Sequence, residues 1–282
     1  MKIENVSDTA RWVAVYRAME TERPDALFRD PYARRLAGEH GEEIVRGMQR
    51  GRQMAWAMIT RTQVFDEMIL RAVRDGADTV LNLAAGLDAR AWRLDLPAAL
   101  RWVDVDLPGI LNHKTELLKG EKTRCRYEPL AVDLTDAAAR RALFERIGRE
   151  SKKVVVVSEG LLIYLGDDDV AGLADDLHAV ASFRWWVIDL ASPLLLNMMT
   201  RMWGKTTAEA NAPFRFAPPA GTDFFVPHGW REVEFHSSMD EARRLKREMP
   251  GAGFWRLFMW LYPKQVLEKY RRMSAFVLLE RR

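Results

Sequence analysis

The feature that most constrains the fold of this chain is a regular alternation of short apolar runs with helix-like segments through its middle. Five mainly apolar runs are separated by segments with helical periodicity. Short, continuously apolar strands that alternate with helices are typical of a parallel sheet with helices on both faces. The expected strands are residues 79–83, 100–105, 127–132, 153–157 and 184–190, and the expected helices are residues 88–94, 109–119, 137–147 and 167–180.

The residues on either side of this alternation are expected to extend the same sheet domain. Residues 1–75 carry helical patterns and are predicted to form a helical segment packed on the core. Two further segments are predicted to complete the sheet: residues 230–235, where apolar and polar residues alternate, and residues 274–279, which form an apolar run. The sequence therefore predicts an α/β fold with a doubly wound, mostly parallel, seven-stranded sheet, and residues 76–282 form its core.

Residues 192–228 break the alternation because they are rich in Met, Phe and Pro. We expect this stretch to be a helical lid inserted over the sheet rather than another strand–helix unit. Its apolar side chains either line a pocket or pack as an ordinary helix on the sheet. A later aromatic cluster, residues 254–262, is expected to pack against the body of the domain.

Charge and cysteine content argue against several classes of function. The 43 Lys and Arg residues nearly balance the 40 Asp and Glu residues, which disfavours a nucleic-acid partner. The basic residues of segment 243–247 stand beside Asp240 and Glu241 and are interpreted as a solvated helix face. A single cysteine, Cys125, excludes an internal disulfide and favours a reducing, cytoplasmic setting. With no apolar stretch of membrane-spanning length and no signal-peptide pattern, we expect no membrane contact, and a monomer or homodimer.

The loop after the first predicted strand, residues 84–88, is the first candidate for a binding site. In doubly wound folds, ligands bind at the carboxyl ends of the strands, near the point where the strand order reverses. Ala84, Ala85 and Gly86 are small enough to let the backbone approach a ligand, and the following helix offers free N–H groups. Because the third glycine of the dinucleotide fingerprint is missing, the loop does not favour a nicotinamide cofactor. Asp88 is equally well explained as a helix N-cap.

Acidic residues follow three further predicted strands, where they would share one edge of the sheet. Asp106 ends the second strand about twenty residues after the loop, a place from which a carboxylate can bond ribose hydroxyls. Asp104 points the same way but lies further from the edge. Asp133 follows the third strand, where it could bond an adenine amino group, and Glu159-Gly160 follows the fourth. Each acid alone fits a helix cap or a solvent-facing side chain equally well, but together with the loop they form a coherent site.

The residues around the loop also carry a resemblance to a known family. Residues 80–94, Val-Leu-Asn-Leu-Ala-Ala-Gly-Leu-Asp-Ala-Arg-Ala-Trp-Arg-Leu, resemble the signature of the leucine carboxyl methyltransferase family. Similar motifs recur across residues 7–165, while the last third of the chain matches more loosely. These motifs include residues 7–33, Arg61-Thr62, Asp104 to Pro108 with Lys114, Asp133-Leu134-Thr135 and Ser158-Glu159-Gly160-Leu161. The resemblance implies a Rossmann-like methyltransferase with S-adenosyl-L-methionine as cofactor.

The resemblance also implies roles for individual residues. Arg61 would hold the carboxylate of the cofactor, Arg11 lies near a second basic position, and Gly86 would contact the amino-acid end. Asp106 would bind the ribose. The chain departs from the family at Ala84, where glycine is usual, which bears on cofactor affinity more than on fold. The full predicted set of cofactor-binding residues is Arg11, Arg61, Ala84, Gly86, Asp106, Leu107, Asp133, Leu134, Glu159 and Gly160, and no metal site is expected.

Arg61 can also be assessed on physical grounds. The planar guanidinium group matches the geometry of a carboxylate, so an arginine on a helix over the sheet is well suited to an amino-acid tail. The alternative is a structural salt bridge with Asp66 or Glu67 on the same helix.

The predicted reaction is O-methylation of a small, largely apolar molecule whose acceptor group is a carboxylate or a phenol. A carboxylate is already ionised at neutral pH, whereas a phenol needs a base. None of the five histidines has the spacing of a nucleophile or metal site, which favours a carboxylate, and His228 is the candidate base. Tyr16 and Arg17 are predicted to face the pocket, with Arg17 as a clamp for an anionic acceptor.

Three other functions stay open at this point. A nicotinamide-dependent oxidoreductase would share the fold class, but the incomplete glycine pattern disfavours it. A non-catalytic S-adenosyl-L-methionine-binding protein is favoured by Ala84 and Asn82 in the loop region. The family resemblance also leaves open a protein C-terminal carboxyl methyltransferase.

Overall fold

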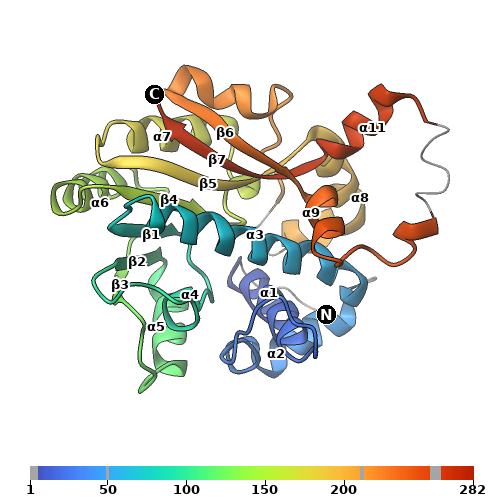
Figure 1. Cartoon of the computed structure of the whole chain (residues 1–282), viewed down its shortest axis with the longest axis horizontal. Coiled ribbons are helices and arrows are strands. Elements are labelled where there is room, and N and C mark those ends of the chain that lie inside the picture. Colours follow the sequence, from blue (N-terminus) through green and yellow to red (C-terminus); the bar gives the residue numbers. More distant parts are fainter. Residues whose placement is uncertain (1–5, 49–50, 210–212, 255–261) are drawn as a thin grey trace.

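The computed structural model describes residues 6–48, 51–209, 213–254 and 262–282 and contains a seven-stranded sheet with the order β3-β2-β1-β4-β5-β7-β6 (Figure 1). Strands β1 to β5 run parallel to one another, and β7 is antiparallel to both β5 and β6. The predicted doubly wound, mostly parallel, seven-stranded sheet is confirmed. The strands are β1 (Thr79–Leu83), β2 (Arg101–Asp106), β3 (Arg126–Ala131), β4 (Val154–Ser158), β5 (Phe183–Ala191), β6 (Trp230–Ser237) and β7 (Ser274–Arg281).

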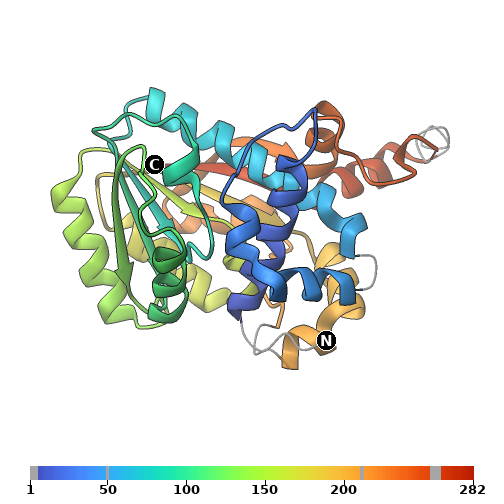
Figure 2. The same ribbon diagram turned by 90° about the horizontal axis from the view of Figure 1, so that it is seen from below.

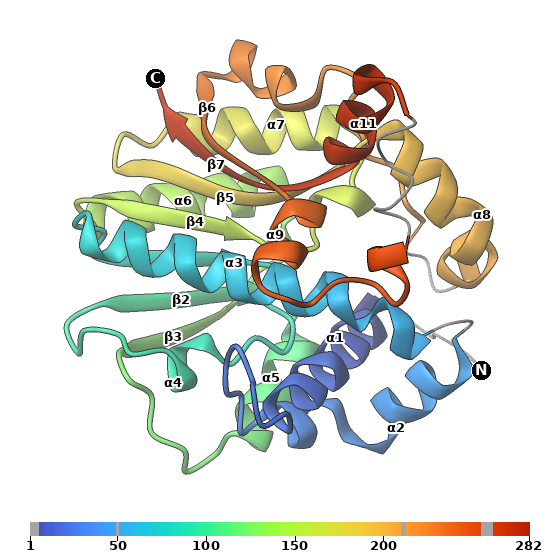
Figure 3. The ribbon, with the colours of Figure 1, turned by 45° about the vertical axis from the view of Figure 1, so that its right-hand side comes forward.

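Helices cover both faces of this sheet, and α3 runs along one of them (Figures 1 and 3). Short 3₁₀ helices lie at η1 (Gly51–Met54), η2 (Leu162–Tyr164) and η3 (Gly221–His228). The α-helices are α1 (Val6–Thr21), α2 (Ala33–Gly47), α3 (Ala55–Arg74), α4 (Arg90–Arg93), α5 (Pro108–Leu117), α6 (Ala137–Glu150), α7 (Asp167–His178), α8 (Pro193–Glu209), α9 (Ser238–Arg244) and α11 (Lys264–Arg271).

The central strands send alternate side chains into two apolar cores, one on each face of the sheet. Val80 packs with Phe65 of α3 in one core, and the next residue, Leu81, packs with Phe144 of α6 in the other. All four side chains are completely buried. Burial of a side chain of this size contributes about 1.5–3 kcal/mol, so the middle of the sheet is a rigid base for the loops at its carboxyl edge.

The N-terminal helices α1 and α2 lie side by side near one end of α3 (Figure 2). The C-terminal third of the chain is joined to them by a buried ion pair. Nη2 of Arg247 lies 2.8 Å from Oε1 of Glu20 in α1, and Nε lies 3.0 Å from Oε2. Glu20 is fully buried and Arg247 is 8% exposed. The interpretation of segment 243–247 as a solvated face is therefore wrong for Arg247, because its partner on a distant helix draws the guanidinium inside.

The stretch predicted as a lid contains α8 and η3, and α8 lies at the same edge of the sheet as α1 (Figure 3). The aromatic cluster 254–262 falls largely on residues 255–261, which lie outside the described residues. The two flanking aromatics that are described, Phe254 and Tyr262, are 64% and 47% exposed. No helix in the described ranges has the length and apolar character to cross a membrane.

Candidate active site

A cavity of about 1060 Å³ opens at the carboxyl ends of the parallel strands. Its walls come from the strand ends, from α1 and α3, and from α8 and α9. Most of the predicted site residues meet here although they are far apart in the sequence. The cavity is lined by Tyr16, Arg17, Arg61, Ala84, Gly86, Asp106, Leu107, Asp133, Leu134, Glu159 and Gly160, whereas Arg11 and His228 are not among the lining residues.

The loop between β1 and α4 forms the floor of the cavity. Gly86 has a φ of 51°, and a Cβ atom placed on it would lie 3.1 Å from the Cβ of Ala10 in α1. A side chain at position 86 would therefore both strain the left-handed backbone and press against α1, which favours glycine. The Gly86 N–H donates to Oδ2 of Asp106 at 2.7 Å, which ties the loop to the end of β2.

Asp106 and Asp104 lie on the same strand but have different environments. Asp106 lines the cavity, and its Oδ1 also accepts a bond from the N–H of Leu107 at 2.7 Å. Burial raises the pKa of Asp106, and these backbone bonds offset only part of the effect. Asp104 is completely buried, where Nζ of Lys114 lies 2.7 Å from its Oδ2 and Asn82 donates to its Oδ1 at 3.0 Å. The geometry thus favours Asp106, as predicted, as the acid that can reach a ligand.

Asp133 and Leu134 follow β3 at the rim of the same cavity. The Asp133 side chain is exposed, and Oδ1 accepts bonds from the hydroxyl and the N–H of Thr135 at 2.7 and 2.9 Å. The hydroxyl bond, followed by the backbone bond, lowers the pKa of Asp133. The side chain is therefore ionised and fixed in direction at neutral pH.

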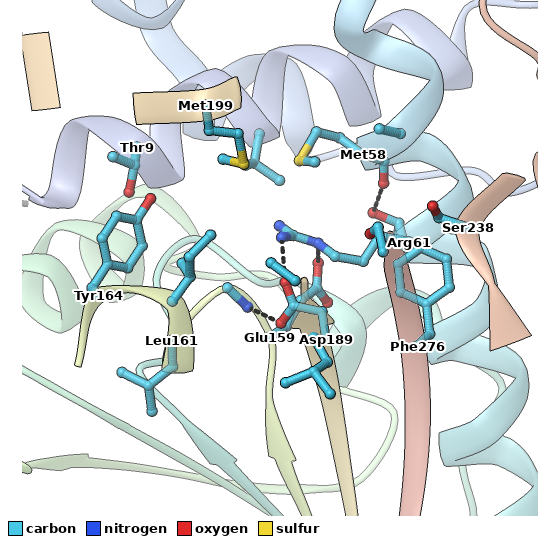
Figure 4. Close-up of a pocket in the computed structure, with 18 of the residues that line it drawn as sticks. Thr9, Met58, Arg61, Glu159, Leu161, Tyr164, Asp189, Met199, Ser238 and Phe276 are labelled. Carbon is cyan, nitrogen blue, oxygen red and sulfur yellow. Dashed lines mark hydrogen bonds and ion pairs between the residues drawn. The ribbon is translucent and has the colours of Figure 1, made fainter. Parts of the chain in front are cut away.

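Arg61 extends from α3 to the ends of β4 and β5 (Figure 4). Its Nε donates to Oε1 of Glu159 at 3.0 Å and its Nη1 donates to Oδ2 of Asp189 at 3.1 Å. The alternative salt bridge with Asp66 or Glu67 on the same helix is wrong, since these acids bind other partners. Asp66 pairs with Arg90 and Arg93, and Glu67 accepts bonds from Gln63 and Arg244.

Asp189 is a cavity-lining acid that the sequence reasoning missed. Asp189 stands inside an apolar strand, where its sequence context indicates no binding role. A signal was nevertheless present in the sequence. An acid near the end of an apolar run is unusual, and Asp189 lies near the carboxyl end of its predicted strand. Burial raises the pKa of Asp189, and Arg61 opposes this rise.

A second arginine, Arg90, forms ion pairs with two acids that line the cavity. Nη1 of Arg90 lies 2.7 Å from both Oε2 of Glu159 and Oδ2 of Asp88. Burial opposes the ionisation of both acids, but the nearby arginines outweigh it. Arg90 and Arg61 lower the pKa of Glu159. Arg90 and Arg93 lower the pKa of Asp88 to about 2. Asp88 also accepts a bond from the N–H of Arg90 at 2.8 Å. Helix α4 nevertheless begins after Ala89, which is its N-cap residue, so the alternative that Asp88 is the helix N-cap is wrong.

With this geometry in view, the comparisons with known proteins identify the chain's relatives. Residues 10–178 match the model of the leucine carboxyl methyltransferase family. The chain belongs to this family. Proteins named "Putative S-adenosyl-L-methionine-dependent methyltransferase" from Parafrankia and Streptomyces avermitilis are 31% and 35% identical to it. The first alignment covers 89% of this chain and 86% of the relative, and the second covers 83% and 86%.

Other family relatives match over a shorter stretch. A protein of the same name from Rhodococcus jostii is 39% identical over 172 residues, which are 58% of each protein. A relative from Mycolicibacterium smegmatis is 36% identical, and the alignment covers 64% of its length. These two alignments thus span less than two thirds of the relatives' own length.

Solved structures share the fold of this family member. The crystal structure of a duf574 family protein from Streptomyces avermitilis superposes with a TM-score of 0.62 over 97% of both chains, at 13% identity. The crystal structure of a protein titled "putative methyltransferase" from Thermobifida fusca gives a TM-score of 0.56 at 14% identity, and the match covers 96% of this chain and 94% of the other.

Ala84, the position at which the resemblance led us to expect glycine, has a strained backbone. Ala84 has a φ of 51°, the left-handed region that strongly favours glycine. A non-glycine residue pays about 1–2 kcal/mol there. The surrounding structure holds the strained loop in place, because Ala85 N–H bonds to the carbonyl of Val105 at 3.1 Å.

The predicted catalytic residues Tyr16 and Arg17 line the cavity but are committed to other contacts. The Tyr16 hydroxyl donates to the carbonyl of Gly51 at 2.7 Å, and burial raises the pKa of Tyr16 to about 12. Arg17 donates from Nε to Asp30 at 2.8 Å and from Nη2 to the carbonyl of Leu87 at 2.6 Å. Both side chains therefore stabilise the cavity wall. The Arg17 guanidinium binds Asp30 and the loop residue Leu87, and these contacts replace the predicted contact with an anionic acceptor.

Arg11 and His228 are the two predicted site residues that the structure does not bring to the cavity. The Arg11 guanidinium lies beside Gly38 of α2. His228 ends η3, and its Nδ1 lies 2.7 Å from Oδ1 of Asp175 in α7. The expectation that His228 reaches the active site fails because η3 packs along α7 on the outer face of the sheet.

Proposed function

We propose that this chain is an S-adenosyl-L-methionine-dependent O-methyltransferase that acts on a small, largely apolar acceptor. The observation that carries the proposal is the single cavity in which nucleoside-binding and amino-acid-binding groups face one another. Asp106, Asp133, Arg61, Glu159 and Gly86 all line this cavity. The family match over residues 10–178 and the names of the relatives support the same donor.

The residues present fit this cofactor by their chemistry. Asp106 presents a fixed carboxylate for ribose hydroxyls, and Asp133 presents one for an exocyclic amine. Arg61 provides a guanidinium for a carboxylate, and Gly86 leaves room where any side chain would meet Ala10. When bound, the cofactor supplies a methyl group on a positively charged sulfur.

The acceptor would occupy the remaining, mostly apolar part of the cavity. Leu195, Met198, Met199 and Met202 of α8 face this part together with Met58 of α3. Methionine side chains are flexible and adapt to ligands of varied shape. An apolar wall of this kind orients an acceptor through contact area and excludes water from the transfer.

A carboxylate is the acceptor group that the cavity supports best. Among the described residues, no His, Lys or Cys lines the cavity. Burial raises the pKa of both Tyr16 and Tyr164, so neither phenol is a ready base. A carboxylate acceptor needs no base because it is ionised at neutral pH, so this chain's residues would only have to align it.

A methyl-transfer screen with radiolabelled S-adenosyl-L-methionine tests the proposal. The acceptor panel pairs aromatic and fatty acids with their phenol or alcohol counterparts of equal size. We expect transfer to acids, with base-labile ester products. Transfer to phenols alone would show that the acceptor group is a phenol and not a carboxylate. Absence of cofactor binding in calorimetry would overturn the proposal.

The family description gives a second candidate, carboxyl methylation of a protein C-terminus. A peptide that ends in leucine therefore belongs in the same screen. Methylation of this peptide in preference to every free acid would favour the second candidate.

A further inference from the structure

Asp189 stands beside Glu159 at the carboxyl edge of the sheet although it lies beyond the residues that match the family model. β4 and β5 are parallel neighbours whose register sets Ser158 opposite Ile188. The next residue of each strand is therefore an acid at the same edge. The Asp189 side chain is 20% exposed and lines the cavity.

Two donors from opposite sides fix the Asp189 carboxylate. The N–H of Gly160 donates to Oδ1 at 2.7 Å, and Nη1 of Arg61 donates to Oδ2 at 3.1 Å. Since Arg61 also donates from Nε to Glu159, its guanidinium lies between two carboxylates (Figure 4). These bonds use two of the five N–H groups of a guanidinium, and Nη2 supplies two more beside Gly160.

The surrounding ion pairs do not neutralise all of the negative charge. The pairs that continue from Arg61 and Glu159 link four arginines to five carboxylates, which leaves one negative charge in excess. The members are Arg17, Arg61, Arg90 and Arg93, with Asp30, Asp66, Asp88, Glu159 and Asp189.

The excess charge is concentrated at Asp189. Among the described residues, Glu159 has two arginine partners, Arg61 and Arg90, whereas Asp189 has Arg61 alone. Accordingly, burial raises the pKa of Asp189, while at Glu159 the two arginines outweigh burial and lower it. A positively charged ligand group beside Asp189 would balance the cluster.

We propose that Asp189, with Glu159, binds the α-ammonium group of the ligand's amino-acid tail while Arg61 binds its carboxylate. An α-amino acid carries a cation and an anion on one carbon, and a guanidinium between two carboxylates presents the complementary pattern. Asp189 is then the residue that selects a nucleoside with an amino-acid tail over the bare nucleoside. This inference rests on the proposed function, since it concerns the cofactor of the same site.

The test uses three adenosine thioethers whose tails carry different charged groups, measured by calorimetry on the full chain. S-adenosylhomocysteine carries an ammonium and a carboxylate, S-adenosyl-3-thiopropylamine carries the ammonium alone, and 5′-methylthioadenosine carries neither. In the unaltered protein we expect the amine to bind at least about tenfold more tightly than methylthioadenosine, the size of one charged hydrogen bond. Equal affinity for these two ligands would overturn the inference without the need for any variant.

The variant Asp189→Asn removes the charge and keeps an oxygen for the Gly160 N–H. We expect the advantage of the amine to shrink to about threefold or less, while the affinity for methylthioadenosine is unchanged. A parallel loss for all three ligands would indicate a purely structural role, and a retained amine advantage would exclude Asp189. The matched control is Asp169→Asn, an acid that lines the same cavity and bonds only its own helix start, and it should alter none of the three affinities.

The same ligands separate Asp189 from Arg61 and from the proposed function. Arg61→Met should weaken S-adenosylhomocysteine more than the amine, because only the former carries a carboxylate. If the unaltered protein binds none of the three ligands, the proposed function fails. If it binds them without regard to the ammonium, the function stands and the role of Asp189 fails.

Discussion

Nζ of Lys114 lies 2.7 Å from Oδ2 of Asp104, and both side chains are completely buried directly behind the loop of residues 84–88. The same ammonium also donates to the carbonyl of Asp88 at 3.2 Å. This pair therefore connects α5 and β2 to the loop that forms the cavity floor.

Removal of one partner of this pair should be strongly destabilising. In Lys114→Met, Asp104 is left as a buried charge without its cation, which typically costs about 3–5 kcal/mol. Urea unfolding followed by circular dichroism measures the loss. Lys119→Met on the same segment is the control, because Lys119 forms an exposed pair with Glu116 and should change stability by less than about 0.5 kcal/mol. Equal effects of the two substitutions would contradict the assigned role.

Ala84→Gly should stabilise the protein. Glycine adopts the left-handed φ of 51° without steric strain, whereas alanine pays about 1–2 kcal/mol. Part of that gain is lost to the greater backbone freedom of glycine in the unfolded chain, which leaves a net gain of about 0.5–1 kcal/mol. Thermal unfolding provides the measurement. Ala85→Gly, at a neighbouring position without a positive φ, should instead lower the melting temperature, and a lower melting temperature for Ala84→Gly as well would refute the strain.

Asp106→Asn should weaken adenosine binding and leave adenine binding unchanged. The substitution removes the charge that strengthens bonds to ribose hydroxyls, and a loss of about 1.5–3 kcal/mol is typical of a charged hydrogen bond. Adenine lacks the ribose, so it serves as the control ligand in the same titration. An adenosine affinity equal to that of the parent would count against the ribose role.

The stability contribution of His236 should fall as the pH rises. Its Nδ1 and Nε2 lie 3.0 Å from Glu241 and Glu234, and the bond to Glu241 is the main reason why the pKa of His236 is raised. A histidine with a raised folded-state pKa adds stability that is complete below its unfolded value of about 6.5 and is lost as the pH rises through the folded value. The same two acids also pair with Arg71 and Arg244.

The measurement compares His236→Gln with the parent by urea unfolding at pH 5.5 and at pH 9. We expect the variant to be clearly less stable at the lower pH and close to the parent at the higher one. A difference that is independent of pH would show that packing, and not charge, explains the contribution of His236.

The fold could be predicted closely from the sequence because its signals are local. The apolar run of residues 153–157 became β4 (Val154–Ser158), since a continuous series of valines in a buried strand has no competing helical pattern. The acids at Asp106 and Glu159 could be placed at one edge for the same reason, because parallel strands bring their carboxyl ends together.

What the sequence could not show were pairings between distant segments. Arg61 is 98 residues from Glu159 and 128 from Asp189, so no spacing rule on its own helix reveals either partner. Arg247 is 227 residues from Glu20, and its burial follows only once α1 and the C-terminal segment are packed together. His228 failed as a site residue for the converse reason, since its loop folds against α7 and away from the cavity.

The two sides of the cavity come from different parts of the chain. The loop of residues 84–88, Arg61 and Asp106 lie within residues 10–178, which match the family model, whereas Asp189, α8 and α9 lie outside that stretch. Substitutions in α8 can thus accumulate without disturbing the loop, Arg61 or Asp106. Under the proposed function, exchange of α8 is therefore expected to change which acceptor is methylated while the loop, Arg61 and Asp106 keep their places.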